Sequence, residues 1–207
     1  MTRTASNKIG TIILGAGASS RMGEPKQLLR WKKETLVDRA IAQAIGLAAG
    51  PVVLVLGANA ELIASSLSPG KYHIAQNENW KTGMGSSIVC GLQTLLDAPG
   101  QLAGVLITLV DQPLITSSDL EKIIEKYKKV LPPLIAAFYE DTLGVPALFS
   151  ADLFPELLTL SGQKGAKAII NKYRESLAKL DLPAAKIDLD TPEEWQTFLQ
   201  RKNFGNF

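Results

Sequence analysis

The feature that most restricts the fold is a set of short runs that are apolar at nearly every position and end abruptly in a glycine or an aspartate. A strand without polar alternation is typical of a parallel sheet that is covered on both faces. The runs therefore predict buried parallel strands whose carboxyl ends carry small or acidic residues. They are Thr11–Leu14 before Gly15-Ala16-Gly17, Val52–Leu56 before Gly57, and Val105–Val110 before Asp111.

Stretches with a 3.6-residue apolar period separate these runs and predict helices. Strands that alternate with helices predict an α/β fold, a Rossmann-like three-layer sandwich with a mostly parallel, mixed sheet. Ligands bind such sheets at the carboxyl ends of the strands, so we expect the glycines after Leu14 and the Asp111 carboxylate to share one edge. The expected helices cover residues 35–49, 60–67, 86–96, 117–129 and 164–173, and further strands cover 134–139 and 185–187.

The chain is large enough to bury a core without disulfides or a structural metal, with 207 residues of which 46% are hydrophobic and 20% charged. No internal repeat, long linker or change of composition divides it. We therefore predict a single domain over residues 1–207, with disordered tails at 1–8 and 200–207.

Composition also excludes several classes of protein. A single cysteine, Cys90, and a single histidine, His73, exclude an internal disulfide and a Cys/His zinc site. The net charge of +2 argues against a nucleic-acid partner, and the lysines of residues 122–129 alternate with glutamates as on a solvated helix face. The longest apolar run, residues 9–18, is too short to span a membrane. We expect a cytoplasmic protein.

The loop after the first strand carries most of the functional information. Its small residues let backbone N–H groups approach an anion closely. A Walker loop needs Gly-Lys-Ser/Thr, which is missing here, and a dinucleotide fingerprint needs a glycine where Ser20 stands. The third interpretation is a triphosphate loop, in which Arg21 forks to two phosphate oxygens and Lys26 supplies a mobile point charge. The length of the loop favours this over plain surface charges.

Five ordered blocks of this sequence resemble the nucleotidyltransferases of molybdenum-cofactor biosynthesis, and more narrowly their molybdenum cofactor cytidylyltransferase branch. The resemblance implies a nucleotide-diphospho-sugar transferase-like fold and a Mg²⁺-dependent enzyme of the EC 2.7.7 type. An acceptor phosphate would attack the α-phosphorus of an NTP and release pyrophosphate. The blocks are residues 14–29, 79–87, 111–113, 144–149 and 188–194.

The resemblance also assigns roles to individual residues. Arg21, Lys26 and Asp111 are the expected catalytic residues, and Asp111 and Asp190 the expected metal ligands, with Asp188 a weaker candidate. The expected nucleotide contacts are Leu14, Ala16, Gly17, Ser19, Arg21, Lys26, Gly85, Ser86 and Ser87. The expected acceptor contacts are Gly144, Pro146, Lys164 and Lys167.

Structural alternatives stay open for some of these residues. Asp190 would serve equally as the cap of a helix that begins near Pro192, and Ser86 as the cap of the helix over 86–96. Trp80 and Met84 either pack on a ligand or fill the core.

The substrates follow from smaller features of the resemblance. The alanine at position 16 resembles the residue that the cytidylyl enzymes carry at this place in the loop. This favours CTP as the nucleotide, with GTP as the alternative. Molybdopterin is the implied acceptor, and a transient contact with a molybdoenzyme is then expected. Gln163, Lys167 and Val145 depart from the usual pattern on the acceptor side. A sugar phosphate or another small phosphate therefore stays open as the acceptor, as do a dinucleotide-binding oxidoreductase and a non-catalytic nucleotide-binding accessory protein.

Overall fold

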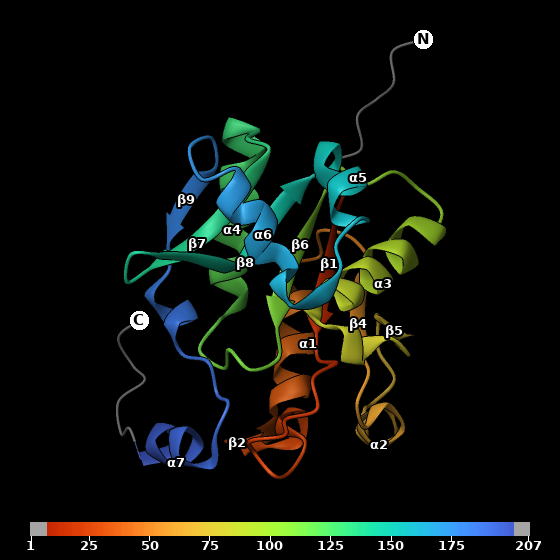
Figure 1. Cartoon of the computed structure of the whole chain (residues 1–207), viewed down its shortest axis with the longest axis vertical. Coiled ribbons are helices and arrows are strands. Elements are labelled where there is room, and N and C mark those ends of the chain that lie inside the picture. The colour runs from red at the N-terminus through yellow and green to blue at the C-terminus, as the bar shows by residue number, and fades with distance from the viewer. Residues whose placement is uncertain (1–7, 201–207) are drawn as a thin grey trace.

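The computed structural model describes residues 8–200 and folds them around one large twisted sheet (Figure 1). Its strand order is β5-β4-β1-β6-β8-β7-β9. A separate hairpin joins β2 (Arg30–Trp31) to β3 (Glu34–Thr35). The strands of the large sheet are β1 (Ile9–Leu14), β4 (Val52–Leu56), β5 (His73–Gln76), β6 (Gly104–Leu109), β7 (Leu134–Tyr139), β8 (Thr142–Ser150) and β9 (Ala178–Asp181).

The sheet is mixed, as predicted. Strands β5, β4, β1 and β6 run parallel to one another, β8 is antiparallel to both β6 and β7, and β9 is parallel to β7. All residues of β1 and β4 are buried, which explains why these strands are apolar at nearly every position. Because β8 is antiparallel to β6, its first half lies beside the carboxyl end of β6, and Ala147 pairs with Ile107.

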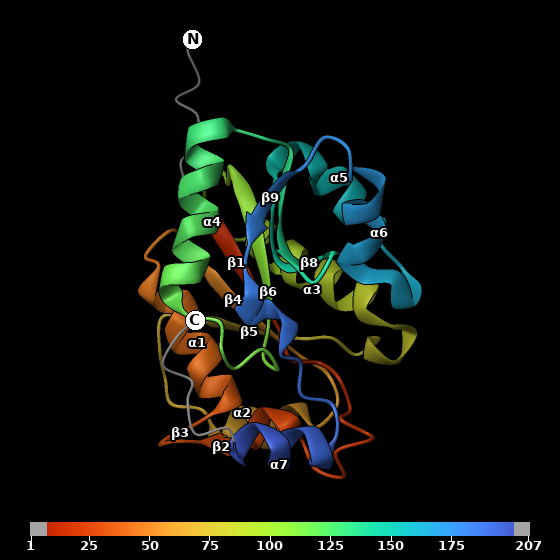
Figure 2. The same ribbon diagram turned by 90° about the vertical axis from the view of Figure 1, so that its left-hand side faces the viewer.

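Helices cover both faces of the sheet and complete the predicted three-layer sandwich (Figure 2). Helices α1 (Leu36–Gly46) and α4 (Ser117–Val130) lie on one face. Helices α3 (Met84–Asp97), α5 (Phe154–Leu157) and α6 (Gly165–Lys172) lie on the other. Each face has its own buried apolar cluster against the sheet.

Local sequence signals explain where these helices begin. Thr35 caps α1, because its side chain accepts a hydrogen bond from the Asp38 N–H. Thr116 and Asp119 form a capping box at the start of α4. The lysine-rich face of α4 is mainly exposed, as predicted.

The chain ends in a helix that sits apart from the two helical layers. Helix α7 (Pro192–Gln200) lies beside the β2–β3 hairpin (Figures 1 and 2). The Phe198 ring packs against Trp31 at 5.0 Å between centroids and stacks on Trp195 at 5.7 Å. This packing anchors the segment that precedes α7, residues 187–191, against the body of the protein.

Several elements differ from the expectations. Strands β2, β3, β5, β8 and β9 and helix α5 were not predicted, and residues 185–187 do not form the expected strand. Residues Pro183–Lys186 form a short 3-10 helix, η5, instead. This prediction was wrong because a proline that lacks an N–H begins the segment and favours a helical turn there.

The other expectations concern the extent of the chain. The expected tails at 1–8 and 200–207 lie outside the described residues, apart from Lys8 and from Gln200, which ends α7. Within residues 8–200, no helix is long and apolar enough to cross a membrane.

Candidate functional site

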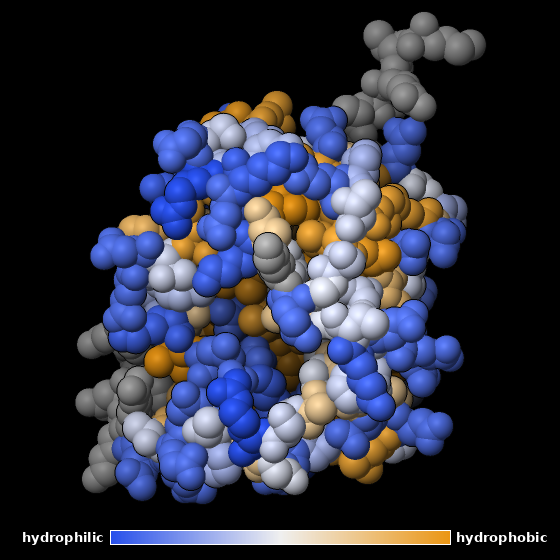
Figure 3. Space-filling view, in the orientation of Figure 1, coloured by the Kyte–Doolittle hydropathy of each residue, from blue (hydrophilic) through white to orange (hydrophobic). Residues whose placement is uncertain are grey.

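A cleft of about 490 Å³ lies at the carboxyl ends of β1 and β6. The glycine loop after β1 forms one wall and the start of α3 forms another. Asp111 and the segment before α7 close it, and Gln163 contributes from the turn before α6. The face of the molecule drawn in Figure 3 is hollowed near its centre, with apolar residues in the hollow and polar residues around it.

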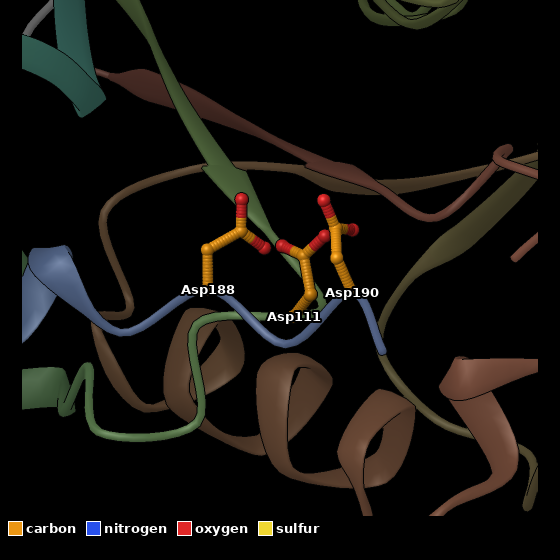
Figure 4. A group of neighbouring side chains, drawn as sticks. All are labelled: Asp111, Asp188 and Asp190. Atoms are coloured by element: carbon orange, nitrogen blue, oxygen red, sulfur yellow. The ribbon is translucent and has the colours of Figure 1, made fainter. Parts of the chain in front are cut away.

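Three carboxylates converge in this cleft (Figure 4). Asp111 follows β6, whereas Asp188 and Asp190 come from the extended segment between η5 and α7. One carboxylate oxygen from each of the three lies within 4.8 Å of those of the other two. The structure thus brings together the two expected metal ligands and the weaker candidate, Asp188.

Two cations from the glycine loop reach the same carboxylates. The Lys26 ammonium group forms a salt bridge with Asp111 and another, at 2.8 Å, with Asp190. The Arg21 guanidinium contacts the second oxygen of Asp190 at 2.5 Å. The Lys26 side chain is only 14% exposed whereas that of Arg21 is 68% exposed, so the lysine lies inside the cluster and the arginine at its solvent-exposed edge.

The Asp190 side chain does not cap α7. Thr191 and Glu194 do so: the Glu194 carboxylate accepts hydrogen bonds from the N–H groups of Asp190 and Thr191, and the Thr191 hydroxyl accepts one from the Glu194 N–H. The side chain of Asp190 therefore remains available to the cleft.

The charges of the cluster shift the pKa values of its members. Burial opposes the charged form of Lys26, but the attraction and hydrogen bonds of Asp111 and Asp190 outweigh burial, and the pKa of the ammonium is raised. Burial also opposes the ionised form of Asp190, yet Lys26 and Arg21 lower its pKa.

The pKa of Asp188 is shifted in the direction opposite to that of Asp190. Although Asp188 as a whole is exposed, its carboxyl group is partly withdrawn from water and faces the negative charges of Asp111 and Asp190. These effects exceed the attraction of Lys26 and raise the pKa of Asp188 to about 7. An excess of carboxylates over cations in one place is typical of a site that a further cation completes.

The carboxylate oxygens of Asp111, Asp188 and Asp190 are suitable ligands for a hard divalent cation. Oδ1 of Asp111 is buried and has no hydrogen-bond donor among the described residues. A buried carboxylate oxygen without a donor costs free energy, which a metal ion would recover. Carboxylate oxygens are the ligands that Mg²⁺ and Mn²⁺ prefer.

A buried glutamine shapes the glycine loop. Gln27 is 1% exposed, and its amide nitrogen donates to the backbone oxygens of Gly15 at 2.7 Å and Gly17 at 3.0 Å. Ser19 lies outside the cleft lining and accepts a hydrogen bond from the Lys26 N–H at 3.0 Å. Leu14, Ala16 and Gly17 line the cleft, and a Cβ added at Gly17 would meet nothing within 4 Å.

At the opposite wall, Asn77 binds both of the serines that were predicted to contact the nucleotide. Its side-chain nitrogen donates to Ser86 Oγ at 2.9 Å and to Ser87 Oγ at 3.0 Å. Ser87 lines the cleft, whereas Ser86 bonds back to Gly83 O and lines a different hollow. Gly85 packs on the Ser161 backbone outside the cleft lining.

The alternatives for this wall have different outcomes. Ser86 does not cap α3, because the capping position is Gly83 and the helix begins at Met84. Trp80 and Met84 both line the cleft. Trp80 also packs against the apolar core of this face, whereas Met84 is 45% exposed and does not fill the core.

The expected acceptor contacts are less well gathered. Gly144 and Pro146 lie in the first half of β8, near the carboxyl end of β6, and Gln112 Nε2 reaches Val145 O between them at 3.1 Å. Lys167 is exposed on α6 and, like Gly144 and Pro146, is absent from the cleft lining. The side chain of Lys164 lies outside the described part of the structure. These four assignments stay predictions.

Three polar residues that shape the site were not predicted individually: Gln27, Asn77 and Gln112. Each is at most 5% exposed and donates to two oxygens through its side-chain nitrogen. In the sequence they stand out only as amide residues that directly follow Lys26, β5 or Asp111. An amide residue at such a place is equally typical of a solvated loop.

Comparison with known proteins supports the interpretation of the cleft. Residues 11–177 match the MobA-like NTP transferase domain. The nicotine blue oxidoreductase of Paenarthrobacter nicotinovorans is 29% identical over 91% of this chain and 95% of its own. The molybdenum cofactor cytidylyltransferase of Escherichia coli K12 is 24% identical, over 93% and 96%.

A solved structure extends the likeness to the fold. The Rv0371c protein of Mycobacterium tuberculosis H37Rv, determined in complex with manganese, superimposes with a TM-score of 0.77 at 24% identity, covering 94% of this chain and 99% of its own. The expected nucleotide-diphospho-sugar transferase-like fold is confirmed. With the sheet, the glycine loop and the carboxylate cluster in place, the match over residues 11–177 means that the chain belongs to the MobA-like NTP transferase domain family.

Proposed function

We propose that this protein is a nucleotidyltransferase that needs a divalent metal and transfers CMP from CTP to a phosphorylated acceptor, with molybdopterin as the first acceptor to test. One observation carries the proposal: Lys26 from the glycine loop lies with Asp111, Asp188 and Asp190 in one cleft, and Arg21 from the same loop reaches Asp190 from outside the cleft lining. A triphosphate with its metal needs such cations and carboxylates side by side.

Each residue then has a limited task. Asp111, Asp190 and Asp188 would hold Mg²⁺ or Mn²⁺, which when bound neutralises charge on phosphate oxygens. Lys26 orients the α-phosphate, and the exposed Arg21 binds the departing pyrophosphate. The acceptor phosphate is already ionised at neutral pH, so no general base is required. Catalysis is then positioning and charge neutralisation.

The acceptor and the nucleotide rest on weaker support than the chemistry. Ala16 and the cytidylyltransferase relative favour CTP and molybdopterin. GTP, and a sugar phosphate or another small phosphate, are the alternatives. A transient contact with a molybdoenzyme that receives the product, and a cytoplasmic location, belong to the same proposal.

The test is pyrophosphate release from a panel of NTPs with Mg²⁺ or Mn²⁺ and molybdopterin or other phosphates. Lys26→Ala and Asp111→Ala should each slow turnover by about 10²–10³-fold, because each removes a preorganised electrostatic group. Lys122→Ala, on the exposed face of α4, is the matched control and should leave turnover unchanged. Near-normal turnover in either site variant would remove the assigned role.

A second candidate function is a dinucleotide-dependent oxidoreductase, which the 29% identical relative favours. Against it, Ser20 stands where the dinucleotide fingerprint needs a glycine. Thermal unfolding separates the two, since a bound ligand stabilises the folded state. Protection by NADH but not by CTP with Mg²⁺ would favour the oxidoreductase. Protection by CTP without pyrophosphate release from any acceptor would indicate a non-catalytic nucleotide-binding protein.

A further inference from the structure

The Gln27 amide is fully used by the glycine loop. Its nitrogen donates to Gly15 O and Gly17 O, at 2.7 and 3.0 Å, and its oxygen accepts from the Ser19 hydroxyl at 3.4 Å. Only the nitrogen end of an amide can face two carbonyl oxygens, so its orientation is fixed. At 1% exposure, Gln27 has no contact with solvent that could replace these bonds.

As a result, residues 15–17 of the loop present N–H donors to the cleft, while each of their three carbonyls is already bound. Of the three consecutive carbonyls, two are bound by Gln27 and the third, Ala16 O, accepts from the Ala58 N–H at 3.0 Å. The Gly15 N–H is bound to Val55 O at 2.9 Å. By contrast, the N–H groups of Ala16 and Gly17 donate to no acceptor within residues 8–200, and both residues line the cleft.

The same amide is linked to the charged group of the site. Ser19 Oγ, which donates to Gln27, also accepts from the Lys26 N–H at 3.0 Å. Gln27 therefore joins the loop that lines the cleft to the backbone that carries the Lys26 ammonium group. A shift of either would move the other.

We propose that Gln27 is a positioning residue for the nucleotide, which rests on the function proposed above. It turns the loop carbonyls away from the cleft, so that only N–H donors meet the acceptor atoms of the NTP. It also fixes the backbone of Lys26. Without its amide, the buried Gly15 carbonyl and the partly buried Gly17 carbonyl lose their donor and can be satisfied only by turning toward the cleft or toward water. Turned carbonyls would repel the same acceptor atoms.

Those acceptor atoms belong either to the phosphates or to the base, and inorganic tripolyphosphate tells the two sources apart. Titration calorimetry measures the binding of CTP with Mg²⁺ and, separately, of tripolyphosphate with Mg²⁺, each in the absence of the acceptor substrate. Gln27→Met keeps the volume and loses the amide, and should weaken CTP binding by about tenfold or more. If tripolyphosphate binding weakens equally, the loop binds phosphate; if it is unchanged, the loop binds the base.

The matched control is Gln43→Met, which removes a partly buried glutamine that joins α1 to α4 through Ser117, away from the cleft. It should lower the melting temperature and leave CTP binding unchanged. In steady-state assays, Gln27→Met should raise the KM for CTP and leave the KM for the acceptor unchanged, a split that plain loss of stability does not produce.

Ser19→Ala is the second variant, because Ser19 is only half-buried and its replacement does not threaten folding. It breaks the link between Gln27 and Lys26 and should weaken CTP binding about threefold. If Gln27→Met or, should that variant not fold, Ser19→Ala binds CTP as the wild type does, the positioning role is refuted while the proposed function stands. If the wild type itself binds no NTP, the proposed function fails instead.

Discussion

The Lys26 ammonium group contacts two of the three carboxylates that would hold a divalent ion. It contacts Asp111 and Asp190, and both of these aspartates belong to the group that could bind a cation. Burial and the negative charges of Asp111 and Asp190 outweigh the attraction of Lys26 and raise the pKa of Asp188 to about 7. In this arrangement Lys26 and a divalent ion compete for the same carboxylates until a phosphate group offers the lysine another partner.

This competition predicts an unusual response to Lys26→Met. The variant should bind Mn²⁺ more tightly than the wild type in the absence of nucleotide, by roughly tenfold, because the carboxylates lose a competing cation. It should at the same time lose turnover, as for Lys26→Ala. Calorimetric titration with MnCl₂ at pH 8, above the pKa of Asp188, gives the affinity.

Asp190→Asn is the control for the lysine experiment, since it removes a ligand and should weaken Mn²⁺ binding. Weaker Mn²⁺ binding by Lys26→Met as well would show that the lysine supports the metal site and does not compete with it.

Residue patterns predicted the charged part of the site better than its neutral part. Arg21, Lys26 and Asp111 stand beside a glycine loop or at a strand end, where the topology forces them to one edge of the sheet. Asn77 and Gln27 act through contacts with backbone or hydroxyl oxygens across turns. Such contacts depend on loop conformation, which the pattern of apolar residues does not determine.

At the scale of the elements, Gln112 holds together the three segments that meet at the carboxylates. Its side-chain nitrogen donates to Val145 O in β8 at 3.1 Å and to Ala185 O in η5 at 2.9 Å. The Leu189 N–H bonds to Asp111 O at 3.3 Å. These bonds set the distance between Asp111 and the segment that carries the other two aspartates.

Gln112→Leu should therefore loosen the metal site. The substitution leaves two backbone oxygens without a donor, which we expect to cost about 1–3 kcal/mol of unfolding free energy. Mn²⁺ binding should weaken by more than that of the Gln43→Met control, which also loses a glutamine tie but lies away from the carboxylates. Urea unfolding and Mn²⁺ titration measure the two effects. Unchanged Mn²⁺ affinity would mean that η5 is held by other contacts.

The same region shows where prediction of elements failed. The central parallel strands and their helices were predicted within a few residues, because burial on both faces or on one stripe leaves a plain apolar pattern. Strand β8 has Gly144 and Pro146 within it, and both residues argue against a strand. Strands β5 and β9 lie at the edges of the sheet, are four residues long and are partly exposed, so their pattern is weak.

At the scale of the whole molecule, the site joins the beginning and the end of the chain. The loop that carries Arg21 and Lys26 follows β1, whereas Asp188 and Asp190 precede the last helix. The packing of Phe198 on Trp31 links these two parts, and so do the salt bridges of Arg21 and Lys26 with Asp190. Nucleotide and metal together would bind to both at once.

Hydrogen exchange should record this joint binding. CTP with Mn²⁺ should slow amide exchange in residues 14–29 and in residues 183–200, because a ligand that binds only the folded arrangement stabilises it by about 2.7 kcal/mol at a hundredfold excess over Kd. Residues of α4 lie away from the cleft and serve as the internal reference. Where these amides exchange through local opening and not through global unfolding, their exchange rate should stay unchanged. CTP without metal should protect the loop alone, because its phosphates attract Lys26 and Arg21 away from Asp190. Equal protection of both segments by CTP alone would mean that the nucleotide contacts the C-terminal segment directly, and that the carboxylates are not the link between the two ends of the chain.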